Sequence, residues 1–90
     1  MGYPEYKIEF SDNAADDLRY FLKSGQLGLI KKIKNLIDSI TENPASGIGK
    51  PELLKHNLAG YYSRRIDREH RIIYKVDQQT IRILSLRGHY

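Results

Sequence analysis

The sequence contains no cysteine, and this absence removes several classes of protein at once. A disulfide-stapled fold, a thiol nucleophile, an iron–sulfur cluster and a cysteine-type zinc site are all excluded. Only three histidines are present, His56, His70 and His89, and their spacing matches no standard metal-ligand pattern. We therefore expect neither a metal ion nor a cofactor.

Long hydrophobic runs are also missing, because strictly apolar stretches reach only two or three residues. A membrane-spanning helix needs about 20. The N-terminal segment carries Glu5, Lys7 and Glu9, which is not the pattern of a signal peptide. With 40% hydrophobic and 29% charged residues, the composition is typical of one folded domain spanning residues 1–90. We expect a cytoplasmic protein without a membrane partner.

The net charge of +4 comes entirely from the second half of the chain. Residues 50–90 contain nine Lys and Arg against four Asp and Glu, whereas residues 1–49 contain six against seven. Such an asymmetry is typical of a surface that binds nucleic acid or an acidic protein. It is equally typical of a solvated sheet face that carries basic side chains.

Hydrophobic periodicity predicts the element order β-α-α-β-β-β. Residues 6–10 alternate as a half-buried strand does, and Ser11, Asp12 and Asn13 are good N-cap residues for the helix that follows. A second helix should end near residues 41–43, since Pro44 cannot continue it. The predicted elements are a strand over 6–10, helices over 14–23 and from 27, a loop over 44–51, a helical turn or irregular segment over 51–58, and strands over 61–66, 70–76 and 80–87.

The apolar pattern also predicts how these elements pack. Ile30, Ile33, Ile37 and Ile40 form a helical stripe that should lie in the core. The last strand is apolar on both parities apart from Arg82 and Ser85, so it should be central in the sheet.

The register of the hairpin over residues 61–76 follows from its alternating pattern. If residues 67–69 form the turn, Arg65 lies opposite Arg71, and His70 falls on the mostly apolar face as a core histidine. The other face, with Ser63 and Ile73 among its residues, is then mostly polar and basic and should be exposed. Two opposed guanidinium groups repel each other unless an anion lies between them.

The basic half contains the residue types that metal-free RNA cleavage requires. A base must take the proton of the 2′-hydroxyl, an acid must protonate the leaving 5′-oxygen, and cations must hold the charged phosphorane. Glu52 or Glu69 can supply the base and His89 the acid, while Tyr61 can stack on a base. The cations are Lys55, Arg65 and Arg71. The same residues also suit a non-catalytic ribosome- or RNA-binding module, or a module that binds an acidic peptide.

Four stretches of the sequence resemble the Txe/YoeB family of toxins. Residues 49–60 read G-K-P-E-L-L-K-H-N-L-A-G, against a family pattern of G-K-P-E-x-L-K-H-x-L-x-G. Residues 62–66 are an aromatic followed by S-R-R-I, residues 69–74 read E-H-R-I-I-Y, and the chain closes with H-Y. Patterns of this length with intact spacing make the resemblance specific.

The resemblance implies a RelE-like α+β fold, in which a two-helix hairpin packs on a small, mostly antiparallel sheet. It implies the toxin of a type II toxin–antitoxin module, an mRNA interferase that cuts mRNA in the ribosomal A site and inhibits translation. The implied partners are mRNA, the ribosome, a cognate acidic antitoxin and a second copy of the chain.

Roles for individual residues follow from the same resemblance. Glu52 corresponds to the general base, His89 to the general acid, and Arg71 to the arginine that stabilises the transition state. Tyr90 corresponds to a terminal tyrosine that helps to position RNA. The implied RNA- or phosphate-binding residues are Lys50, Lys55 and Arg65.

Overall fold

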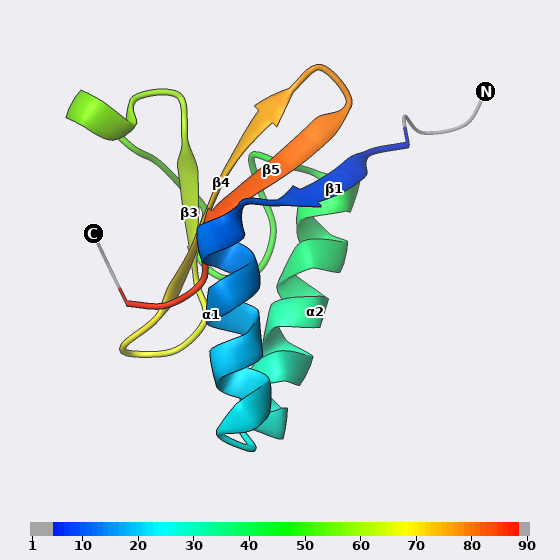
Figure 1. The fold of residues 1–90 in the computed structure, drawn as a ribbon. Helices are drawn as coiled ribbons and strands as arrows, with labels where there is room; N and C mark the ends of the chain where they lie inside the picture. Colours follow the sequence, from blue (N-terminus) through cyan, green and yellow to red (C-terminus); the bar gives the residue numbers. More distant parts are fainter. Residues whose placement is uncertain (1–4, 89–90) are drawn as a thin grey trace.

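The computed structural model describes residues 5–88, which form a mixed five-stranded sheet with two α-helices on one face (Figure 1). The strand order is β1-β5-β4-β3-β2, with β1 parallel to β5 and the other neighbouring pairs antiparallel. The expected α+β architecture is therefore confirmed. The elements are β1 (Lys7–Phe10), α1 (Asp12–Lys23), α2 (Leu27–Glu42), β2 (Glu52–Leu53), the 3₁₀ turn η1 (His56–Leu58), β3 (Tyr62–Arg65), β4 (Arg71–Asp77) and β5 (Thr80–Ser85).

Strand β2 is the element that the hydrophobic pattern does not predict. The pattern gives a helical turn or irregular segment over 51–58, and η1 supplies that turn. The structure adds an edge strand before it, pairing Glu52 with Ser63 and Leu53 with Tyr62. Two residues are too few to display an alternation of period 2, so this strand is visible only through its pairing.

The helix ends lie within two residues of the predicted positions. The Ser11 side chain caps α1 by accepting a hydrogen bond from the Ala14 N–H at 3.0 Å, and Gly25 follows the helix with a positive φ of 70°. Helix α2 ends at Glu42, two residues before Pro44. In the described part of the chain, no helix has the length and apolar character needed to span a bilayer.

The buried face of α2 is offset from the predicted isoleucine stripe. Ile30 and Ile37 are only half-buried, at the side of this face. Two leucines that the prediction leaves out lie at its centre together with the other two isoleucines. The buried residues of α2 are Leu29, Ile33, Leu36 and Ile40.

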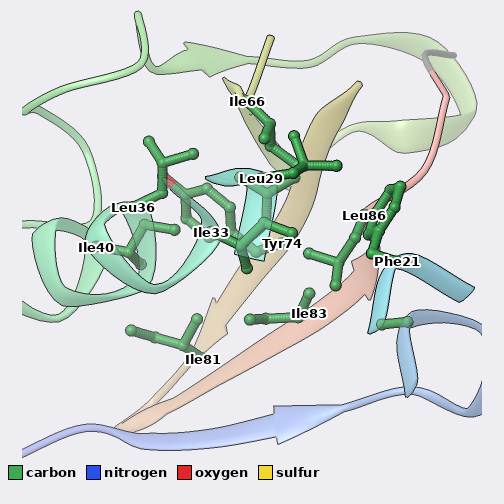
Figure 2. Close-up of a cluster of buried hydrophobic side chains, with 12 residues drawn as sticks. Phe21, Leu29, Ile33, Leu36, Ile40, Ile66, Tyr74, Ile81, Ile83 and Leu86 are labelled. Atoms are coloured by element: carbon green, nitrogen blue, oxygen red, sulfur yellow. The ribbon is translucent and has the colours of Figure 1, made fainter. Parts of the chain in front are cut away.

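The hydrophobic core lies between the helix pair and the inner face of the sheet (Figure 2). Strand β5 runs between β1 and β4, which confirms the prediction that the last strand is central. Its inner residues Ile81 and Ile83 are fully buried. Phe21 of α1 and Leu86, just beyond β5, lie side by side at one end of the core in Figure 2.

The predicted hairpin register is correct. Arg65 pairs with Arg71 across β3 and β4, and the Ile66 N–H donates to the His70 carbonyl at 2.9 Å. The prediction is wrong in treating the whole outer face as exposed, because Ser63 and Ile73 are buried there. Ile73 lines a hollow together with Leu58, which follows β2, and with Arg87 and Gly88, which follow β5.

Arg64 is fully buried, and all five of its N–H groups donate to neutral oxygens. Nε donates to the Tyr74 hydroxyl at 3.0 Å, and that hydroxyl donates to the Pro44 carbonyl at 2.6 Å. The other acceptors are the Ser39 hydroxyl and the carbonyls of Asn43, Ser46 and Ile48. The guanidinium of β3 therefore fixes the loop that leads from α2 to β2.

Gly47 allows this loop to wrap closely around the guanidinium. Its φ is 132°, a conformation that residues with side chains rarely adopt. A Cβ at this position would collide with the Ser39 hydroxyl and would lie 2.9 Å from Nη1 of Arg64. The glycine is thus required by both the backbone conformation and the close approach.

We expect Arg64→Met to lower the free energy of unfolding by about 3 kcal/mol, because it leaves several buried oxygens without donors. Arg65→Met is the matched control, since the neighbouring arginine is exposed. It should change stability by less than about 0.5 kcal/mol. Urea unfolding of both variants measures the difference, and equal losses would contradict the assigned role of Arg64.

Burial raises the pKa of Tyr74, and the opposing effect of the Arg64 guanidinium does not cancel this shift. Because the folded state holds the phenol proton more tightly, the stabilisation is fully present below about pH 10, the ordinary pKa. It is lost as the pH rises through the raised folded value. We therefore expect a negative slope of the unfolding free energy above pH 10 that Tyr74→Phe makes shallower.

Urea unfolding between about pH 9 and pH 11 measures this slope. Tyr20→Phe is the control, because that ring is 43% exposed and lies on the surface of α1. It should keep the slope of the wild-type protein. An unchanged slope in Tyr74→Phe would show that burial of this phenol does not affect its proton binding.

Candidate active site

The outer face of the sheet brings one carboxylate and two arginines together across β2, β3 and β4. Arg65 and Arg71 lie directly opposite each other, and Glu52 lies opposite Ser63 on the neighbouring pair of strands. Nη1 of Arg71 is 3.9 Å from Oε2 of Glu52 and donates to the Ser63 hydroxyl at 3.4 Å. The cluster thus combines three charged residues from separate parts of the predicted motif: Glu52, Arg65 and Arg71.

Backbone hydrogen bonds on both sides of β2 hold Glu52 in this position. Before the strand, the Arg65 N–H donates to the Gly49 carbonyl at 2.6 Å. After the strand, the Leu54 N–H donates to the Tyr61 carbonyl at 2.9 Å. Since Arg64 also fixes the loop before β2, the position of the Glu52 carboxylate depends on this buried guanidinium.

The side chains of the cluster are exposed to solvent to different extents. The Glu52 side chain is 61% exposed, whereas that of Arg71 is 23% exposed. A separation of 3.9 Å is longer than a direct hydrogen bond, so the pair is a loose one that another anion can replace at little cost. Opposed arginines favour such an anion between them.

The other predicted cations flank this cluster along the chain. Lys50 precedes β2 with a positive φ of 53°, and Lys55 follows β2 at the start of η1. Both lysines are exposed. Further along the same face, Tyr61 lines a shallow hollow with Arg82 and Lys75, whose Nζ lies 5.5 Å from the centre of the tyrosine ring.

The C-terminal segment reaches the cluster at Gly88. The Arg71 N–H donates to the Gly88 carbonyl at 3.0 Å, and the Gly88 N–H donates to Nδ1 of His70 at 2.8 Å. His70 is buried, as predicted for a core histidine. The predicted acid His89 and the predicted Tyr90 lie outside the described residues.

Sequence reasoning missed two residues. Ser63 is buried and accepts a hydrogen bond from Arg71, and Arg64 fixes the loop that leads to β2. The register that pairs Arg65 with Arg71 also places Ser63 on the same face, so the alternating pattern could have predicted this partner. The same alternation places Arg64 on the apolar face, so it could also have predicted the burial of Arg64. Among residues 5–88, no group of three His, Asp or Glu side chains is arranged to hold a metal ion.

A carboxylate beside two guanidiniums can hold an anionic ligand and accept a proton next to it. Arginine is suited to this task because its planar fork matches the oxygens of a phosphate. Such cations can also stabilise the charge that develops on a phosphate during reaction. A proton acceptor beside two phosphate-binding groups is suited to acid–base chemistry at a phosphate group.

Comparison with known proteins identifies the family. Residues 10–90 match the family model of the YoeB-like toxin of bacterial type II toxin–antitoxin systems. The toxin YoeB of Synechocystis sp. is 44% identical over 84 residues, covering 93% of this chain and 96% of that protein. The match thus extends over nearly the whole of both chains.

Solved structures give the same result. The YoeB–YefM toxin–antitoxin heterotetramer of Staphylococcus aureus contains a chain with 49% identity and a TM-score of 0.85, covering 96% of this chain and 99% of that chain. The YoeB dimer of the same organism matches with a TM-score of 0.87 at the same identity and coverage. YafQ of Escherichia coli, at 21% identity and a TM-score of 0.77 with 94% of each chain covered, shares the fold. The chain belongs to the YoeB-like toxin family of bacterial type II toxin–antitoxin systems.

Proposed function

We propose that this toxin is a metal-independent, ribosome-dependent endoribonuclease that cleaves mRNA in the A site and so inhibits translation. The observation that carries the proposal is the loose pair of Glu52 and Arg71, with Arg65 opposite Arg71 on an open face. This cluster combines a proton acceptor with two phosphate-binding groups. Family membership supports the same conclusion.

In the proposed reaction, Glu52 takes the proton of the ribose 2′-hydroxyl, and the oxygen attacks the adjacent phosphorus. The bond from phosphorus to the 5′-oxygen breaks, and His89 gives that oxygen a proton. The products are a 2′,3′-cyclic phosphate and a 5′-hydroxyl end. Because the nucleophile is the 2′-hydroxyl, DNA is not a substrate.

Arg71 changes partner in this scheme. Without RNA, it lies 3.9 Å from the Glu52 carboxylate. When a phosphate binds between the two arginines, it draws the Arg71 guanidinium toward its own oxygens and leaves the carboxylate free to accept a proton. Arg65 and Arg71 then stabilise the additional negative charge of the phosphorane.

The proposed partners follow from charge. Lys50, Lys55 and Arg65 bind phosphates of mRNA or ribosomal RNA, and Tyr90 helps to position the RNA. An acidic segment of a cognate antitoxin covers the same basic face and blocks it, by analogy with the YoeB–YefM complex of Staphylococcus aureus. The YoeB dimer of that organism favours a homodimer here as well. Since ribosomes are the target, the protein acts in the cytoplasm.

We expect Glu52→Gln and His89→Gln to bind ribosomes normally but to cleave roughly 10²- to 10⁴-fold more slowly, because each removes a proton-transfer group. Primer extension on a defined mRNA held in purified ribosomes measures the cut. Normal cleavage by either variant would refute its assigned role. If wild-type protein binds but does not cut, the non-catalytic module is the correct function.

Glu9→Gln is the matched control for Glu52→Gln. Glu9 also pairs with an arginine on the outer face, at 3.7 Å from Arg82, but it lies on the opposite edge strand β1. The variant makes the same change of charge away from the proposed site. It should cleave as fast as the wild-type protein.

Ribosome binding should weaken steeply with salt, since basic side chains that contact RNA release counterions. We expect Lys55→Gln to reduce the slope of log affinity against log salt concentration by roughly one. Lys34→Gln, on the exposed side of α2, should leave the slope unchanged. Titration of labelled toxin with ribosomes between about 50 and 200 mM salt measures both slopes. Equal slopes for the two variants would place the RNA contact elsewhere.

A further inference from the structure

Asp17 is a buried carboxylate in the middle of α1, and its partners are distant in sequence. Its Oδ2 accepts hydrogen bonds from the N–H groups of Leu86, at 2.9 Å, and Arg87, at 3.2 Å. Carboxylates are seldom buried unless hydrogen bonds compensate for the loss of water. Here the donors come from the segment that leaves the sheet after β5 (Figure 1).

His70 is a second buried side chain that accepts a backbone N–H of this segment, one residue further along the chain. The Gly88 N–H donates to Nδ1 of His70, so Nδ1 carries the lone pair and Nε2 the proton, facing Glu69 at 3.8 Å. The imidazole ring packs edge-on against Phe21, with the ring centres 5.0 Å apart. Its tautomer and its orientation are therefore both fixed.

A third contact holds the Arg87 side chain of the same segment. The guanidinium of Arg87 lies over the Tyr20 ring, 3.6 Å from its centre, in a cation–π contact with α1. Strand β5 ends at Ser85, so residues 86–88 lie beyond the sheet. Each of their N–H groups nevertheless has a side-chain acceptor, either Asp17 or His70.

We propose that Asp17 is a positioning residue, whose carboxylate directs the C-terminal segment so that His89 reaches the RNA cleavage site. The proposal rests on the proposed function. His89 is covalently attached to Gly88, and the Gly88 carbonyl accepts the Arg71 N–H at the cluster. Asp17 and His70 therefore set the direction of the chain at residues 86–88, directly before the proposed acid.

The effect should fall on the chemical step rather than on binding. Asp17 of α1 is buried, whereas the proposed RNA-binding cations Lys50, Lys55 and Arg65 are exposed. Misplacing a catalytic group by about 1 Å costs roughly 10²-fold in rate. We therefore expect Asp17→Ala to lower the single-turnover cleavage rate by roughly 10²-fold, with ribosome affinity unchanged.

Two substitutions make the test specific. Asp17→Asn keeps a side-chain oxygen that can accept the two N–H groups, so it should restore cleavage to within a few-fold of wild type. Asp16→Ala is the matched control, because the neighbouring Asp16 is exposed and pairs with Arg19 on the surface. It should cleave like the wild-type protein. All rates are measured well below the midpoint of thermal unfolding of each variant.

Hydrogen exchange of the backbone amides of Leu86 and Arg87 gives a second readout. Protection should be lost in Asp17→Ala and kept in Asp17→Asn and Asp16→Ala. If Asp17→Ala cleaves as fast as Asp16→Ala, or if it loses ribosome affinity instead of rate, the proposal is overturned. If Asp17→Asn is as slow as Asp17→Ala, hydrogen-bond positioning is overturned.

Should Asp17→Ala fail to fold, His70 provides an equivalent pair of variants. In His70→Asn the side-chain oxygen replaces Nδ1 as the acceptor for the Gly88 N–H, whereas His70→Leu preserves volume and removes the acceptor. Only the leucine variant should lose cleavage, and equal rates would overturn the proposal. An inactive wild-type protein would instead refute the proposed function, so the two failures are distinguishable.

Discussion

The guanidinium of Arg64 sits inside the domain, where five neutral oxygens accept its N–H groups, and the loop that supplies most of them has little freedom left. A buried charge without such acceptors would be very costly, so the folded loop and the buried arginine require each other. Because residue 49 is bonded to β3 directly after this loop, the position of Glu52 follows from the same interaction.

Alternation along β3 and β4 explains why pairs of basic residues occur in the motif. Arg64 points into the domain and fixes a loop, while Arg65 points out of it. In the same way, His70 points inward and binds the C-terminal segment, while Arg71 points outward and meets Glu52. Each dipeptide therefore combines one residue that shapes the site with one that belongs to its surface.

The same alternation determines what the sequence can predict. Period 2 suffices to derive the hairpin register, the pairing of Arg65 with Arg71 and the inward position of His70. It cannot reveal β2, which has only two residues, or the acceptors of Arg64, which come from a loop with no periodic pattern. Asp17 is equally hidden, because its bonds to residues 86 and 87 join segments about 70 positions apart in sequence.

The two segments that precede the proposed base and acid share one feature. Residues 43–51 and residues 86–88 both lie outside the strands and helices, where backbone groups lack regular partners. Buried side chains supply those partners: Arg64 donates to the first segment, and Asp17 and His70 accept from the second. Because these three residues are buried only when the core is formed, folding of the core and ordering of these two segments are one event. A small domain can thereby order two irregular segments that would otherwise be flexible loops.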